Sequence, residues 1–279
     1  MLMKVLVTVK TYPTISVKYD ELVCTAGFRE DGSWIRIYPI PFRKKTYEER
    51  YRKYDWIEIE LEKSQQDFRP ESYRPVPGTK IRVVGSIGTE NNWEERKKVC
   101  LRKVYDNLDE LIAEAKNPNI CTSLATFKPT AILDFYAEAT EREWDFREVM
   151  QIQAKRRQLK LFPDDEEDLG EEFRIVRKLP YQFKYRFVDS AGRESNLMIE
   201  DWETGQLFWN CLERHEGDEQ KAIEDVRKKY LDDFARTKDL YFFLGTTMQY
   251  HKKAPNPFVI IGTFHPKREN QLRLFQELS

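Results

Sequence analysis

The clearest structural signal in this sequence is a hairpin near its start. The runs ELVCTAGF (21–28) and SWIRIYPI (33–40) flank the tetrapeptide REDG (29–32). An Asp-Gly pair between two alternating apolar runs is a strong signal for a tight turn joining antiparallel strands. We therefore expect an antiparallel hairpin in the first 40 residues.

Other segments repeat the two-residue period of a strand, and a few carry helical spacing instead. In the first half, strands are predicted at 4–10, 55–63, 80–88 and 130–140, and helices at 44–54 and 93–116. In the second half, we predict a hairpin over 180–203, helices over 205–215 and 218–234, and strands over 240–251 and 257–264. The predicted fold class is α+β: an N-terminal mixed sheet or small, partly closed barrel with helices, followed by a C-terminal α+β half.

An acidic stretch suggests where the chain divides. The segment PDDEEDLGEE (163–172) has seven acidic residues in ten, which is typical of a solvated linker. We predict an N-terminal domain over 1–142, a charged helix and acidic linker over 143–172, and a C-terminal domain over 173–279. The alternative is an acidic surface loop within one domain.

Composition limits the classes of function. The formal net charge is -1, so any binding to a polyanion must come from a local patch. The four cysteines are far apart with no C-x-x-C pair, which favours reduced thiols in the cytoplasm over a zinc ribbon or disulfide framework. No signal peptide, membrane span, phosphate loop or dinucleotide motif is recognisable, so we predict no membrane association and no cofactor.

The strongest basic patch lies at residues 41–54, where six Lys and Arg residues stand against two Glu. Basic side chains bind phosphates, and interleaved aromatic rings can stack on unpaired bases. The alternative is that the face carrying Tyr47, Tyr51 and Tyr54 is buried and the charges are only solvated. The candidate nucleic-acid contacts are Arg43, Lys44, Tyr47, Arg50 and Arg52, extended by Arg69 and Arg74.

Arg69 and Arg74 belong to the segment DFRPESYRPV (67–76), in which each arginine precedes a proline. A residue before proline is biased toward extended backbone. We interpret the segment first as a rigid connector between the strands at 55–63 and 80–88. The two arginines are secondary contacts to the nucleic acid.

A second candidate site lies at the ends of the C-terminal strands, where Asp201, Thr246 and His251 could form a small polar pocket. A hydroxyl and an imidazole act as nucleophile and base only within hydrogen-bond distance. The alternatives are a threonine that simply favours a strand and a carboxylate in a solvated turn. Cys211 with His215, and the acidic run 200–203, are weak metal patterns, and we predict no metal site.

The motifs VKTYPT, DGSWIRIYPIPFR, FRPESYRP, FFLGTT and PNPFVIIGTF together span most of the chain. With them, the sequence resembles a family of uncharacterised bacterial proteins found around DNA-modification and phage-defence genes. The resemblance implies a role in DNA modification or defence and supplies no catalytic residues. We predict a nucleic-acid-binding protein, with DNA as the favoured partner. The alternatives are an enzyme that converts a modified base or nucleotide, for example a deazaguanine side group in DNA, and a protein–protein adaptor for products of neighbouring genes.

Overall fold

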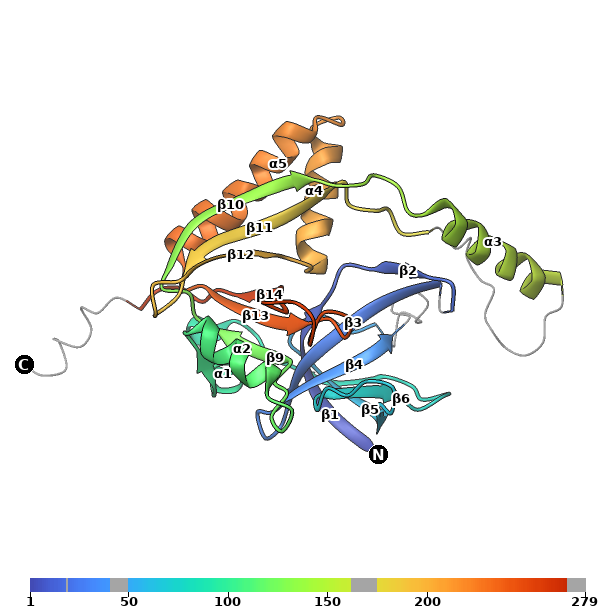
Figure 1. The fold of residues 1–279 in the computed structure, drawn as a ribbon, viewed down its shortest axis with the longest axis horizontal. Helices are drawn as coiled ribbons and strands as arrows, with labels where there is room; N and C mark the ends of the chain where they lie inside the picture. The colour runs from blue at the N-terminus through green and yellow to red at the C-terminus, as the bar shows by residue number, and fades with distance from the viewer. Residues whose placement is uncertain (19, 41–49, 162–174, 270–279) are drawn as a thin grey trace, which may run out of the picture.

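The computed structural model describes residues 1–18, 20–40, 50–161 and 175–269. It confirms the predicted α+β class: an N-terminal closed barrel is followed by a C-terminal region of two sheets and several helices (Figure 1). None of the helices in these residues is long and apolar enough to cross a membrane.

The barrel has five strands and is fully closed. Their order around it is β1–β3–β4–β6–β5, and β1 pairs with β5 to complete the circle. These strands are β1 (Leu2–Lys10), β3 (Asp20–Arg29), β4 (Trp34–Ile40), β5 (Asp55–Lys63) and β6 (Ser72–Pro75). Two shorter strands extend the sheet, β2 (Thr14–Ser16) beside β3 and β7 (Arg82–Ser86) beside β5.

The two-residue period explains the barrel interior. Alternate residues of a strand point to the same face, so Val5 and Val7 both enter one buried cluster with Ile35 and Ile37. The predicted hairpin is confirmed: β3 and β4 are antiparallel neighbours. Gly32 in their turn has a φ of 79°, a left-handed conformation that glycine adopts without a steric penalty.

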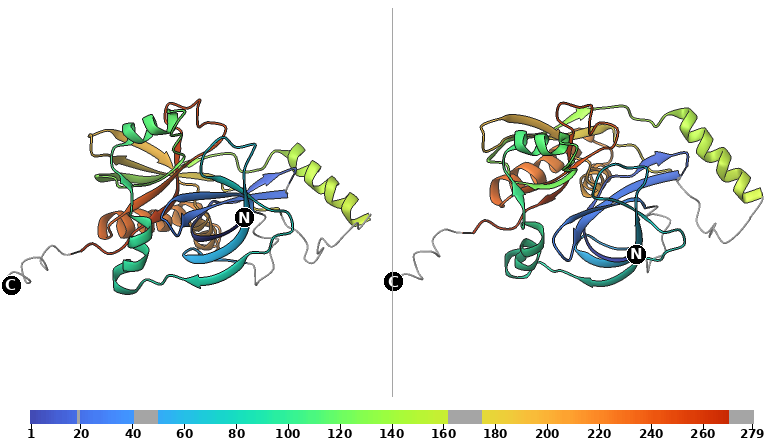
Figure 2. Two further views of the ribbon diagram at one scale, coloured as in Figure 1. Left: turned by 90° about the horizontal axis from the view of Figure 1, so that it is seen from below. Right: turned by 60° about the horizontal axis from the view of Figure 1, so that its bottom comes forward.

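The C-terminal region contains two sheets. The four-stranded sheet is formed by β8 (Val104–Tyr105), β9 (Leu124–Phe127), β13 (Tyr241–Thr246) and β14 (Phe258–Phe264). The three-stranded sheet is formed by β10 (Ala131–Ala139), β11 (Tyr181–Val188) and β12 (Glu194–Met198). Against it pack α4 (Trp202–Arg214), α5 (Glu219–Arg227) and the π-helix η3 (Lys228–Ala235) (Figure 1). A further helix, α3 (Phe146–Leu161), projects from the body of the molecule (Figure 2).

Two helix predictions need correction. The single helix predicted over 93–116 is wrong, because α1 (Glu90–Cys100) and α2 (Leu108–Lys116) are separate helices. Between them β8 pairs with β9, and Asn107 caps α2 by accepting hydrogen bonds from two backbone amides. In the helix predicted over 44–54, residues 50–54 form no helix, and residues 44–49 lie outside the described residues.

The barrel and the C-terminal region share a hydrophobic core. On the outer face of the barrel, Leu6 and Phe28 form one buried cluster with Phe243 and Phe264 of the C-terminal sheet. Strands β9 and β10 lie in the range predicted for the first domain, but they hydrogen-bond to β13 and β11, respectively. The hydrogen-bonded sheets therefore divide the chain near residue 103, and apolar packing then joins the two parts.

Candidate functional site

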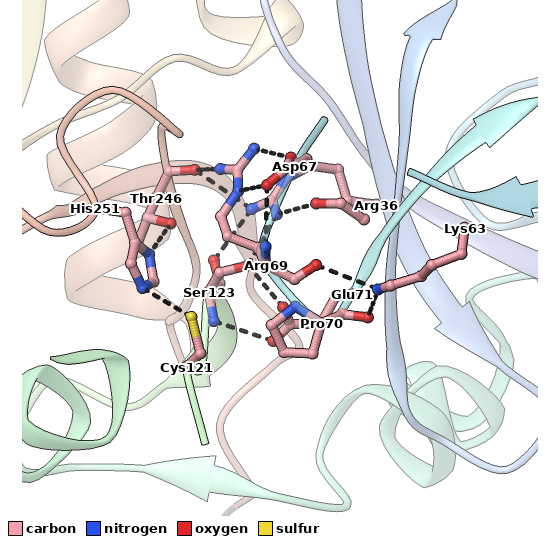
Figure 3. Close-up of polar contacts among 11 residues, drawn as sticks. Arg36, Lys63, Asp67, Arg69, Pro70, Glu71, Cys121, Ser123, Thr246 and His251 are labelled. Atoms are coloured by element: carbon pink, nitrogen blue, oxygen red, sulfur yellow. Dashed lines mark hydrogen bonds and ion pairs between the residues drawn. The ribbon is translucent and has the colours of Figure 1, made fainter. Parts of the chain in front are cut away.

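A buried polar cluster connects the barrel to the C-terminal sheet, and we call it the junction cluster (Figure 3). Its members are Arg36, Asp67, Arg69, Glu71, Ser72, Ser123 and Thr246. Arg36 on β4 donates to the hydroxyl of Ser123 at 2.8 Å and to its carbonyl at 3.1 Å. Glu71 accepts hydrogen bonds from the amide and the hydroxyl of the same serine at 3.0 and 2.8 Å.

Arg69 occupies the middle of the junction cluster. Its Nε lies 2.8 Å from Oδ1 of Asp67, and its guanidinium also donates to the carbonyl oxygen of Thr246. Burial on its own would raise the pKa of Asp67, but the hydrogen bonds and charge of Arg69 outweigh it and lower that pKa to about 2. The two guanidiniums of Arg36 and Arg69 are balanced by the two carboxylates of Asp67 and Glu71. The cluster is therefore suited to hold the two parts together rather than to recruit an anion.

Two of the three predicted catalytic residues lie together: Thr246 belongs to the junction cluster through its carbonyl, and His251 lies beside it. The Thr246 hydroxyl is 2.8 Å from Nδ1 of His251, and Nε2 donates to the carbonyl of Ala115 at 2.8 Å. Nε2 therefore carries the proton and Nδ1 accepts from the threonine, which is the geometry of a hydroxyl nucleophile and its base. Burial lowers the pKa of His251, and its ring is fully buried with Phe68 packed against it. In this conformation the pair is closed to a substrate.

Asp201, the third predicted catalytic residue, belongs to a different cluster. It caps α4, and its two carboxylate oxygens accept from the ammonium of Lys53 at 2.8 and 2.9 Å. Glu203 lies 3.0 Å from the same ammonium. Burial would lower the pKa of Lys53, but these two carboxylates raise it. Among the described residues, no group of three or more His, Cys, Asp and Glu is placed to hold a metal ion.

The predicted nucleic-acid contacts are distributed in three ways. Arg43, Lys44 and Tyr47 lie outside the described residues. Arg50 and Arg52 are exposed on either side of the buried Tyr51, and Arg74 is exposed and paired with Glu62 at 2.8 Å. Arg69 is only 5% exposed, whereas its neighbour Phe68 is 45% exposed. The loop thus turns its aromatic side chain outward and its arginine inward.

A groove of about 780 Å³ runs along the junction on another side. Its walls include Tyr12, two residues beyond the end of β1. They also include Trp202 and Trp209 on α4, and Arg177. The indole nitrogen of Trp209 donates to the Tyr12 hydroxyl at 2.8 Å, and that hydroxyl donates to the carbonyl of Arg177 at 2.8 Å. The guanidinium of Arg177 lies over the Trp209 ring at 3.9 Å. These contacts fix the orientation of the aromatic wall.

Lys10, at the end of β1, lies next to this groove. Its ammonium is 5.7 Å from the ring centre of Trp202 and 5.8 Å from that of Tyr51, and 3.3 Å from the Tyr51 carbonyl. Burial, followed by the charge of Lys53, lowers the pKa of Lys10 to about 8. Lys10 is therefore close enough to the Lys53–Asp201 pair for the charges of that pair to affect its pKa.

Sequence reasoning did not select Lys10, Tyr12, Lys53, Trp202 or Trp209. Local signals existed for two of them, because the aromatic Tyr12 lies two residues beyond the end of a predicted strand and Trp202 opens a helix capped by Asp201. Nothing in the local pattern could pair Lys53 with a carboxylate 148 residues away.

The fold and these contacts define a two-part α+β protein with an aromatic groove where the parts meet. The chain belongs to the family described as Domain of unknown function (DUF8757), whose model matches residues 104–279. A second model, Domain of unknown function (DUF8758), matches residues 1–102. The boundary between the two models coincides with the division of the hydrogen-bonded sheets. No curated protein matches the chain.

Proposed function

We propose that the protein binds nucleic acid, DNA in the first instance, by stacking an unpaired base in the aromatic groove. The groove walls carry this proposal: Tyr12, Trp202 and Trp209 are large planar side chains, two of them joined by a hydrogen bond. Stacking between a base and an aromatic ring is tolerant of sequence, because every base has a π-face. A wall fixed in advance also loses little conformational entropy when it binds.

Basic residues beside the groove support the same proposal. Arg177 lies in the groove wall. Arg50 and Arg52 are the sequence neighbours of Tyr51. The carbonyl of Tyr51 accepts a hydrogen bond from Lys10, which lies next to the groove. Helix α3 contributes the basic residues Arg147 and Lys155 in the part whose side chains the structure describes. Just before α3, the Trp144 indole donates to the carbonyl of Val176 in the groove wall at 2.7 Å. An anionic backbone leaving the groove would therefore find basic residues on two sides.

Replacing Trp202 by alanine should weaken binding to single-stranded DNA by about 5- to 150-fold, the range expected for one lost stacking contact. Trp202→Phe should retain most of the affinity, because it keeps a π-face. The measurement is fluorescence anisotropy of a labelled oligonucleotide over a salt series. The double variant Arg52→Ala/Arg177→Ala should make the salt dependence shallower by about 0.7 per lost phosphate contact.

Tyr250→Ala is the matched control, since Tyr250 is 53% exposed and lines no part of the groove. It should leave the affinity unchanged. Wild-type protein that does not bind DNA at low salt would contradict the proposal. So would equal affinities for wild type and Trp202→Ala.

The alternatives stay predictions. An enzyme acting on a modified base, such as a deazaguanine side group, has weaker support, because Asp201 is bound by Lys53 whereas Thr246 and His251 hydrogen-bond to each other. An adaptor role rests on exposed aromatic side chains, and a place in bacterial DNA modification or defence rests on resemblance. A cytoplasmic location agrees with the four free cysteines, which a reducing compartment would preserve.

A further inference from the structure

One face of helix α4 lines the aromatic groove with polar side chains as well as with rings. Three polar residues follow Trp202 along this face at intervals of four, four and three residues: Gln206, Asn210 and Glu213. Residues at such spacings lie one above another on the same side of an α-helix. All three side chains are exposed and belong to the groove wall. The groove therefore presents hydrogen-bonding groups next to its aromatic surface.

The side-chain amide of Asn210 is held in one orientation by its neighbour. Nε2 of Gln206 donates to Oδ1 of Asn210 at 2.9 Å. Within the described residues no other hydrogen bond involves the Asn210 side chain, so Oδ1 keeps a second lone pair and Nδ2 keeps both hydrogens. Asn210 thus presents an acceptor beside a donor in the groove wall, and both are aligned before any ligand binds.

We infer that Asn210 recognises the edge of the base bound in the groove and favours adenine, with Gln206 as its positioning residue. The inference rests on the proposed function, in which a base stacks on the aromatic wall. A carboxamide forms two hydrogen bonds with adenine: its oxygen accepts from the amino group, and its nitrogen donates to a ring nitrogen. Because Gln206 fixes the amide in advance, little conformational entropy is lost when these bonds form.

Glu213 sharpens the choice among the bases. Its carboxylate belongs to the same wall, one helical turn beyond Asn210. Adenine is the one DNA base without a carbonyl oxygen, so it brings no further acceptor toward this negative charge. Thymine and cytosine carry carbonyl oxygens that the carboxylate repels, and a repulsive element of this kind selects against the wrong ligand. Guanine has two adjacent donors that a carboxylate can bind, so a guanine strand distinguishes recognition by Asn210 from recognition by Glu213.

The test compares labelled twelve-nucleotide strands of equal charge by fluorescence anisotropy: cytosine alternating with adenine, cytosine alternating with thymine, and thymine alternating with guanine. The full chain should bind the adenine strand about 5- to 150-fold more tightly than the other two, the range for one two-bond base contact. Asn210→Leu should remove this preference and leave the affinity for the thymine–cytosine strand unchanged, since leucine has a similar size but makes no hydrogen bond. Gln206→Met should reduce the preference. Gln220→Met, at an exposed position of α5 outside the groove, is the matched control and should behave like wild type.

Equal affinities for the three strands would overturn the inference while the proposed function stands, because stacking alone is tolerant of sequence. A preference for the guanine strand would assign the recognition to Glu213. An adenine preference that survives Asn210→Leu would assign it to another part of the protein, and either result overturns the role of Asn210. If none of the strands binds, the proposed function itself fails, and the inference fails with it. Urea unfolding of each variant verifies that it folds.

Discussion

Replacing Lys53 by methionine should lower the free energy of unfolding by about 3–5 kcal/mol, the cost of removing one partner of a buried ion pair. The side chain of Asp201 is completely buried, and both its oxygens accept from Lys53. Without the ammonium, the carboxylate remains away from water with its charge uncompensated, or it takes up a proton at an energetic cost. Since the pair joins the barrel to α4, the loss should weaken the contact between the two parts.

Urea unfolding followed by circular dichroism would measure this effect. Lys98→Met is the matched control, because Lys98 pairs with Glu95 at 2.6 Å on an exposed helix surface. Exposed pairs contribute little, so that variant should unfold at nearly the same urea concentration as wild type. The double variant Lys53→Met/Asp201→Asn should recover part of the loss, because it removes the unpaired charge. A Lys53→Met protein as stable as the control would show that the pair does not hold the parts together.

A loss of similar size, about 3–5 kcal/mol, is expected for Arg69→Met in the junction cluster. Its guanidinium is the partner of the Asp67 carboxylate and a donor to the Thr246 carbonyl, and all three groups are largely buried. Methionine fills a similar volume but donates no hydrogen bond. Asp67 would then be left with a carboxylate that burial disfavours.

Arg74→Met is an unusually close control, since Arg74 also precedes a proline in the same segment but is exposed. It should change stability by less than about 0.5 kcal/mol. The pH dependence gives a second readout. The pKa of Asp67 is lowered in the folded protein, so its stabilisation is full above pH 3.8 and is lost as the pH falls through about 2. The gap between wild type and Arg69→Met should narrow over this range, and a gap independent of pH would assign the loss to packing instead.

The sequence predicted most of the strands because their two-residue period is local information. The alternation in DWIEIELEK, for example, places Ile57, Ile59 and Leu61 on one buried face of β5. Closure of the barrel was not predictable in the same way. It depends on β1 pairing with both β3 and β5, and no local pattern specifies the second partner.

The candidate site shows the same limit. The second Arg-Pro step lies in β6, as an extended backbone at Arg74 would predict, whereas the first lies in a turn in which the Ser72 amide donates to the Arg69 carbonyl at 3.2 Å. Arg69 points inward because its guanidinium donates to the carbonyl of Thr246, and Phe68 then faces solvent. Thr246 is 177 residues further along the chain, so no local pattern could predict this orientation. The short spacing of Thr246 and His251 did bring hydroxyl and imidazole together. Asp201 did not join them, because Lys53 holds it elsewhere.

The shared core has a consequence for how the two family segments can exist apart. The outer face of the barrel buries Leu6 and Phe28 in one cluster with Phe243 and Phe264, and the Arg36 guanidinium donates to the hydroxyl and the carbonyl of Ser123. A polypeptide carrying residues 1–102 without the remainder would expose that apolar face. It would also leave the Arg36 guanidinium without its acceptors on Ser123. Wherever nature uses either segment by itself, a substitute surface must therefore cover the missing half. Each segment therefore depends on the other to cover its apolar surface, although both belong to one chain.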